Sequence, residues 1–190
     1  MQGASGALIF GSVIRSILNR TQYATQLLQI VNPEEWLKEC YIELVKVFYS
    51  MQGTMSISCI LVLLDDHTGQ LFALNSGHPP MILYRDGKAE FIGEAMINQK
   101  IGESFAYEKI QNQNLKVISF QLTNDDIFLL GSDGKDDILL EDPETGSRSV
   151  NSEDAFFLSC LEEAKCDIDQ ILPTILKRGK LMDDISILKV

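Results

Sequence analysis

Two acidic segments that lie far apart in the sequence are candidates for a shared metal site. Residues 127–134 (IFLLGSDG) form an apolar run that ends at Asp133, and residues 182–190 (MDDISILKV) place Asp183 ahead of a second apolar run. Short apolar runs predict buried strands, and the end of one strand can meet the start of another at one sheet edge. Because Mg²⁺ and Mn²⁺ prefer carboxylate oxygens, we expect Asp133 and Asp183 to share one such ion.

Three neighbouring residues are expected to support these two carboxylates. Ser132 and Gly134 flank Asp133 in a turn, and Asp184 follows Asp183. Adjacent residues of a strand point to opposite faces, so we expect Asp184 to orient the ligands rather than to bind the ion. For an ion held by both carboxylates at about 2.0–2.1 Å, their oxygens should lie roughly 3–5 Å apart. Either segment alone is also explained as an ordinary turn, since Asp and Gly are common there.

The order of motifs along the chain resembles the SpoIIE/RsbU-type branch of the metal-dependent protein serine/threonine phosphatases (PPM family). The matching segments are 1–8 (MQGASGAL), 75–83 (NSGHPPMIL), 100–102 (KIG), 132–134 (SDG) and 183–186 (DDIS). The first is similar to the helix start that follows the family's Asp-x-x-Gly-His/Lys-Gly motif. The others are similar to its aGHpPpll, pLG, TDG and DDiT stretches. Their order and spacing fit essentially all 190 residues.

The resemblance implies an α+β fold, an α-β-β-α sandwich of two antiparallel sheets flanked by helices. It also implies hydrolysis of phosphoserine or phosphothreonine by a metal-activated water, with two Mn²⁺ or Mg²⁺ ions and no side-chain nucleophile. The implied partner is a phosphorylated regulatory protein, such as an anti-sigma antagonist of the STAS type.

One departure from the family pattern concerns its two other acidic motifs, an upstream Gly-Asp and the Asp of Asp-x-x-Gly-His/Lys-Gly, which would both precede Gln2. We therefore expect an N-terminally truncated domain, with residues 1–190 as its C-terminal major part. Asp133 and Asp183 would then hold at most one ion, and turnover by this chain alone should be negligible. A non-catalytic binding or regulatory module that keeps the fold is the alternative. Missing strands would expose sheet edges, so we also expect pairing between copies, as in a homodimer.

Composition narrows the range of partners and compartments. The formal net charge of −11 argues against nucleic acid and anionic lipid, because both would be repelled. No uninterrupted apolar stretch approaches the ~18 residues of a membrane span, so we expect no membrane insertion. The 4 cysteines show no C-x-x-C spacing, which predicts buried free thiols in a reducing cytoplasm.

Hydrophobic periodicity and turn residues predict the elements that position these side chains. The expected helices are 4–18, 33–48 (capped by Asn32), 153–164 (with Ser152 as a cap) and 168–177. The expected hairpins pair 55–64 with 70–75, 81–84 with 89–92 and 116–121 with 126–131, and an acidic loop covers 135–152. His67 should be exposed in a loop. His78 could act as a general acid, but a structural role at a Gly/Pro turn is favoured.

Overall fold

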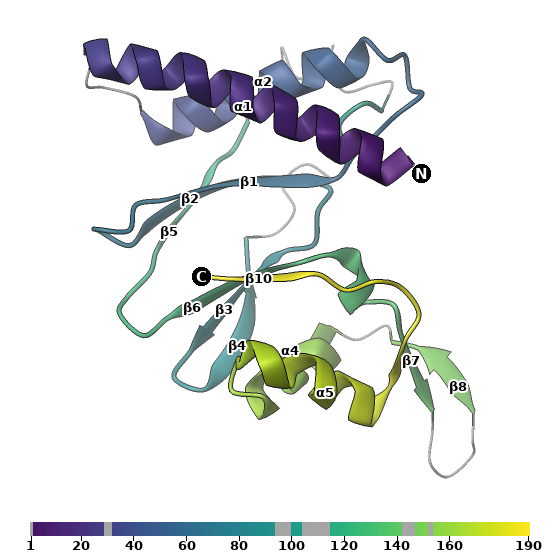
Figure 1. The fold of residues 1–190 in the computed structure, drawn as a ribbon. Coiled ribbons are helices and arrows are strands. Elements are labelled where there is room, and N and C mark those ends of the chain that lie inside the picture. Colours follow the sequence, from purple (N-terminus) through teal and green to yellow (C-terminus); the bar gives the residue numbers. More distant parts are fainter. Residues whose placement is uncertain (1, 29–31, 94–99, 104–114, 142–146, 152–153) are drawn as a thin grey trace. The chain divides into compact units, whose positions relative to one another are not determined.

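The computed structural model describes residues 2–28, 32–93, 100–103, 115–141, 147–151 and 154–190 (Figure 1). Contacts divide the chain into two compact units. The first comprises Met1–His78 and Ala95–Leu122, and the second comprises Pro79–Glu94 and Thr123–Val190. Each unit contains an antiparallel sheet and a pair of helices, which confirms the α+β class.

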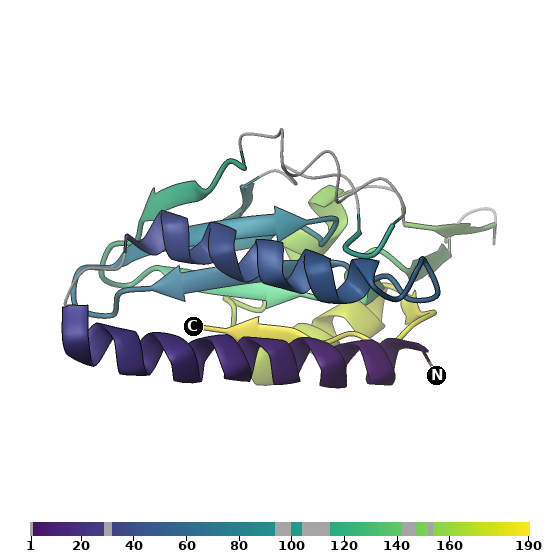
Figure 2. The ribbon, with the colours of Figure 1, turned by 90° about the horizontal axis from the view of Figure 1, so that it is seen from above.

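The helices of the first unit are α1 (Gln2–Leu28), which is longer than the predicted 4–18, and α2 (Pro33–Tyr49). The start of α2 follows from its sequence. The Asn32 side chain accepts a hydrogen bond from the Glu34 N–H at 2.9 Å, and proline occupies the first turn, where no N–H is needed. In Figure 2 the two helices run side by side in opposite directions.

The sheet of the first unit contains β1 (Cys59–Leu64), β2 (Gln70–Ser76) and β5 (Ile118–Gln121), in the order β1-β2-β5. Both helices lie on one side of it (Figure 1). The apolar face of α2, with residues three and four apart, is buried in this core, as its periodicity predicts. The core includes Leu37, Cys40, Tyr41, Leu44, Phe48, Cys59, Leu61 and Leu74, and Trp36 packs against it.

The main sheet of the second unit has the order β10-β6-β3-β4. Its strands are β3 (Met81–Arg85), β4 (Lys88–Ile92), β6 (Ile127–Gly131) and β10 (Ile187–Lys189), and its helices are α4 (Asp154–Glu163) and α5 (Ile168–Arg178). The two helices lie on one side of the sheet (Figure 1). Their buried faces and the sheet enclose Ile82, Leu129, Ile138, Phe157, Cys160, Leu161, Ile171 and Ile175.

The predicted loop over 135–152 is wrong, because it contains two strands. These are β7 (Ile138–Glu141) and β8 (Arg148–Val150), which form a small sheet with β9 (Lys180–Leu181) in the order β8-β7-β9. The acidic residues on both sides of β7 make its short apolar run hard to recognise in the sequence. In the structure Ile138 is buried in the core, which stabilises the strand.

The predicted hairpin of 116–121 with 126–131 is also wrong in its pairing, although both strands exist. β5 pairs with β2, while β6 pairs with both β3 and β10. The connection between them is held by Asp126, whose carboxylate accepts from Arg85 Nε at 2.7 Å and Nη2 at 2.6 Å.

Local turn signals predicted the β3–β4 hairpin correctly. Its two-residue connection, Asp86 and Gly87, has φ values of 51° and 80°, as a type I′ turn requires. The helices α4 and α5 agree with their predicted ranges, and the predicted cap Ser152 lies outside the described residues. Within the described part of the chain, no helix is both long enough and apolar enough to cross a bilayer.

Candidate metal site

The two acidic segments meet at one edge of the second unit's main sheet. β6 and β10 are antiparallel, and Gly131 at the end of β6 lies opposite Ile187 at the start of β10. The turn after β6 therefore lies beside the residues that precede β10. The strand pattern predicts this convergence of the two segments, and the separation of the Asp133 and Asp183 carboxylates stays a prediction.

Hydrogen bonds from Ser132 fix the two segments to each other. Its N–H donates to the Ser186 carbonyl at 2.9 Å, and its hydroxyl accepts from the Ser186 N–H at 3.0 Å. The same hydroxyl lies 3.4 Å from the Asp184 carbonyl, to which it can donate. Ser132 thus positions the turn that carries Asp133, and it does so through backbone groups.

Gly134 is required by the closeness of this approach. A Cβ at this position would lie 2.2 Å from the Asp184 carbonyl oxygen and 2.8 Å from its carbon, so a side chain would collide with backbone. Gly134 itself is buried, and the short 3-10 helix η1 (Asp133–Lys135) begins one residue before it. The family-like SDG motif is therefore a close-packing motif as well as a source of a carboxylate.

The candidate ligands themselves face solvent. Asp133, Asp183 and Asp184 are all exposed, and the Asp183 carboxylate accepts from the Asp184 N–H at 2.8 Å. The acidic pair lies in a bend ahead of β10, so the argument from strand alternation for the role of Asp184 does not apply. Ligation by Asp133 and Asp183, with support from Asp184, stays a prediction.

The donor set suits one hydrated ion better than a pair of ions. Among the described residues, no group of three or more His, Cys, Asp or Glu side chains is arranged to hold a metal. Mg²⁺ is often held by only one or two carboxylates and keeps several waters, which two exposed aspartates can accommodate.

Lys135, which follows the SDG motif, has an environment that sequence reasoning missed. Its side chain is almost fully buried, its Nζ donates to the Asp136 carboxylate, and it lies 5.0 Å from the centroid of the Phe91 ring. A buried ammonium needs such partners to offset its lost hydration. In the sequence, a lysine among acidic residues is indistinguishable from a solvated turn.

A pocket of about 670 Å³ opens beside the acidic pair. Its lining comes from the segment that leads into β10 and from one residue of α5. Its lining residues are Leu172, Leu181, Met182, Asp183, Asp184, Ile185 and Ser186.

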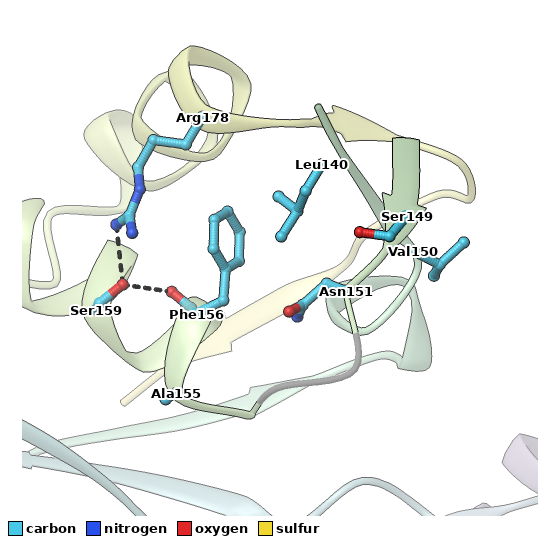
Figure 3. Close-up of a pocket in the computed structure, with 8 residues that line it drawn as sticks. All are labelled: Leu140, Ser149, Val150, Asn151, Ala155, Phe156, Ser159 and Arg178. Atoms are coloured by element: carbon cyan, nitrogen blue, oxygen red, sulfur yellow. Dashed lines mark hydrogen bonds between the residues drawn. The ribbon is translucent and has the colours of Figure 1, made fainter. Parts of the chain in front are cut away.

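A second pocket in the same unit, of about 450 Å³, lies between the β7–β8 hairpin and helices α4 and α5 (Figure 3). Arg178 Nη1 donates to the Ser159 hydroxyl at 2.8 Å, and its guanidinium lies 4.8 Å from the centroid of the Phe156 ring. Ser159 in turn donates to the Phe156 carbonyl at 2.7 Å. These groups tie the end of α5 to α4, which is a structural role.

The histidines have the positions that the sequence favours. His67 is exposed in the β1–β2 turn. The backbone of His78 is bound twice by the fully buried Asn75, whose Oδ1 accepts from the His78 N–H at 2.9 Å and whose Nδ2 donates to its carbonyl at 2.9 Å. This turn geometry supports the structural interpretation of the Gly-His-Pro-Pro segment.

The solved structures that share this fold include three with a TM-score of 0.61. The RsbU and RsbW domains of a Mycobacterium tuberculosis protein match with a TM-score of 0.61 and 19% identity, over 94% of this chain and 46% of that one. The SiaA PP2C domain of Pseudomonas aeruginosa matches with a TM-score of 0.61 and 18% identity, over 95% of this chain and 68% of that one. The PP2C phosphatase domain of Bacillus subtilis SpoIIE, with a fragment of its regulatory domain, matches with a TM-score of 0.61 and 14% identity, over 99% of this chain and 48% of that one.

At these identities the likeness defines the fold, which is that of PP2C-type phosphatase domains. No curated protein matches the chain in sequence. The family model described as stage II sporulation protein E (SpoIIE) matches residues 1–190, and the chain belongs to this family. The chain spans less than half of two of the three solved chains.

Proposed function

We propose that this chain supplies the C-terminal major part of a catalytic domain that removes phosphate from phosphoserine or phosphothreonine of a regulatory protein, such as a STAS-type anti-sigma antagonist. The observation that carries the proposal is the close apposition of two segments. Gly134 lies against the Asp184 backbone, and Ser132 is hydrogen-bonded to Ser186. In this arrangement, both segments carry exposed carboxylates at the same edge of the sheet.

Each residue of the apposed segments has a distinct task in this proposal. Asp133 and Asp183 would hold a divalent ion, Mn²⁺ or Mg²⁺, with water filling its other positions. The Asp184 N–H orients the Asp183 carboxylate. Ser132 and Gly134 fix the distance between the segments. Divalent ions, when bound in this class of site, neutralise phosphate charge and lower the pKa of water.

A second candidate function is a phosphatase-like module that binds without catalysis. The observation that favours it is the small donor set, since the described residues contain no cluster of three or more metal-binding side chains. A two-ion centre needs more oxygen ligands than two aspartates supply. The two candidates differ in whether further carboxylates complete the site.

The assay that separates them measures Mn²⁺-dependent release of phosphate from a phosphoserine protein. It compares residues 1–190 with the same chain preceded by any residues that its reading frame encodes ahead of Met1, and with Asp133→Asn in each. We expect negligible turnover from the short form and substantial turnover from the long form, abolished by Asp133→Asn. Equal activity of both forms would refute the placement of the missing ligands, and an inactive long form would favour the binding module.

A further inference from the structure

Helix α5 carries an apolar stripe that the fold leaves uncovered. Ile168, Leu172 and Leu176 follow one another at intervals of four residues, so they lie on one face of the helix. These three residues and Met182, which we call the α5 stripe, are each between 43% and 58% exposed. The buried face of the same helix is formed by other residues, Ile171, Thr174 and Ile175. Large apolar side chains aligned in this way mark an interaction surface more often than scattered ones do.

The α5 stripe is continuous with the candidate metal site. Leu172, in its middle, and Met182 line the 670 Å³ pocket together with Asp183 and Asp184. A protein whose phosphoserine reaches these carboxylates through this pocket would therefore contact Leu172 and Met182 of the stripe as well. A free phosphate or a small phosphorylated metabolite would leave most of the stripe in contact with water.

Charged side chains of both signs border the α5 stripe. Asp167 and Asp169 are exposed at the start of α5, and Asp183 and Asp184 border the pocket, whereas Lys177 and Arg178 are exposed at the end of α5. The chain as a whole has a formal net charge of −11. A second copy of this acidic chain is therefore repelled, which favours a different protein as the occupant.

We propose that the α5 stripe docks the phosphoprotein substrate through apolar residues that flank its phosphoserine. This inference rests on the proposed function, because the phosphoserine is what brings the partner to the acidic pair. The stripe would then select protein substrates, while the carboxylates of the metal site act on any phosphate monoester that reaches them.

The test is a binding measurement by fluorescence anisotropy on the native chain in the presence of Mn²⁺. One labelled probe is a helix-favouring phosphoserine peptide with leucines at intervals of four residues, and its companion has glutamines in place of the leucines. The variant Leu172→Gln/Leu176→Gln removes the stripe. Leu18→Gln on α1 is the matched control, since Leu18 is 48% exposed outside this unit.

We expect the native chain and Leu18→Gln to prefer the leucine peptide by about tenfold or more, which corresponds to burial of two leucine side chains. The double variant should lose this preference with its melting temperature nearly unchanged, because its substitutions are exposed and glutamine is a good helix former. A native chain without the preference, or a double variant that keeps it, would overturn the proposal.

Two further measurements distinguish a failure of the docking proposal from a failure of the proposed function. Calorimetric titration with Mn²⁺ reports on the metal site, and the double variant should bind Mn²⁺ as the native chain does. If no Mn²⁺ binds but the leucine preference holds, the docking proposal is supported and the metal-site proposal is refuted. If sedimentation shows a native dimer that the double variant converts to a monomer, a second copy covers the stripe and the docking proposal is wrong.

Discussion

The aspartates of the second unit differ in whether their carboxylates are buried and paired or exposed to solvent. The Asp126 side chain is only 2% exposed and accepts from the Arg85 guanidinium and from the Thr123 N–H at 2.7 Å. Hydrogen bonds from Arg85 hold the pKa of the Asp126 carboxyl well below its usual range. Asp133 and Asp183 are exposed instead. Asp126 is therefore part of the framework, and the exposed pair can bind an ion.

The lowered pKa of Asp126 gives stability a defined pH dependence. Above the usual aspartate pKa of about 4 the contribution of the ionised group is fully present, and it is lost as pH falls toward the lowered value, because the unfolded chain then binds more protons. Asp126→Asn should cost about 1–3 kcal/mol of unfolding free energy at pH 7. It should also flatten the decline of that free energy below about pH 4.

Urea unfolding between neutral and acidic pH measures this effect. Asp66→Asn, in the exposed β1–β2 turn, is the control and should follow the native curve. Parallel curves for native protein and Asp126→Asn would show that the Arg85–Asp126 pair does not set acid stability.

Elements with strong local signals were predictable from the sequence, and elements defined by distant partners were not. The Asn32 cap of α2 and the Asp86-Gly87 turn of the β3–β4 hairpin are local, and both were predicted correctly. The partners of β5 and the existence of β7 depend on burial against segments far along the chain. The convergence of the two acidic segments was predictable because family-like motifs mark both strand ends. Lys135 was not, because nothing in its neighbours indicates burial.

The contact between the turn after β6 and the bend before β10 can be tested at one glycine. Gly134→Ala would put a methyl group 2.2 Å from the Asp184 carbonyl oxygen, so one segment must move. We expect a loss of about 1–3 kcal/mol of unfolding free energy, as is typical of overpacking, and weaker Mn²⁺ binding.

A matched control lies three residues earlier. A Cβ at Gly131 would meet its nearest atoms at 3.9 Å, an ordinary contact, so Gly131→Ala should change stability and Mn²⁺ binding little. Chemical denaturation and calorimetric titration measure both quantities. If the two alanine variants behave alike, close packing at Gly134 does not position the site.

At the scale of the whole molecule, each unit buries its own pair of cysteines. Cys40 and Cys59 belong to the core of the first unit, and Cys160 and Cys166 belong to that of the second. Burial raises the pKa of the Cys59 thiol to about 12 and that of Cys40 to about 11. Burial likewise raises the pKa of Cys166 to about 11. Since the thiolate is the reactive form, all four thiols should be inert in the folded chain.

Pulse alkylation at increasing urea, read out by mass spectrometry, tests both this inertness and the single-domain prediction. We expect no labelling of the native chain at pH 8, and simultaneous exposure of all four thiols if residues 1–190 unfold as one cooperative domain. Earlier labelling of one pair would show instead that the two units unfold separately. Labelling of any thiol without denaturant would contradict its burial.

The central claim is that Asp133 and Asp183 jointly hold a divalent ion, and calorimetric titration of the chain with Mn²⁺ tests it most directly. The native chain should bind one ion weakly, because two carboxylates supply only part of a full ligand set. Asp133→Asn and Asp183→Asn should each weaken binding by about tenfold or more, and Asp66→Asn should leave it unchanged. If either site substitution leaves the affinity for Mn²⁺ unchanged, or if the native chain binds no Mn²⁺, the account is contradicted.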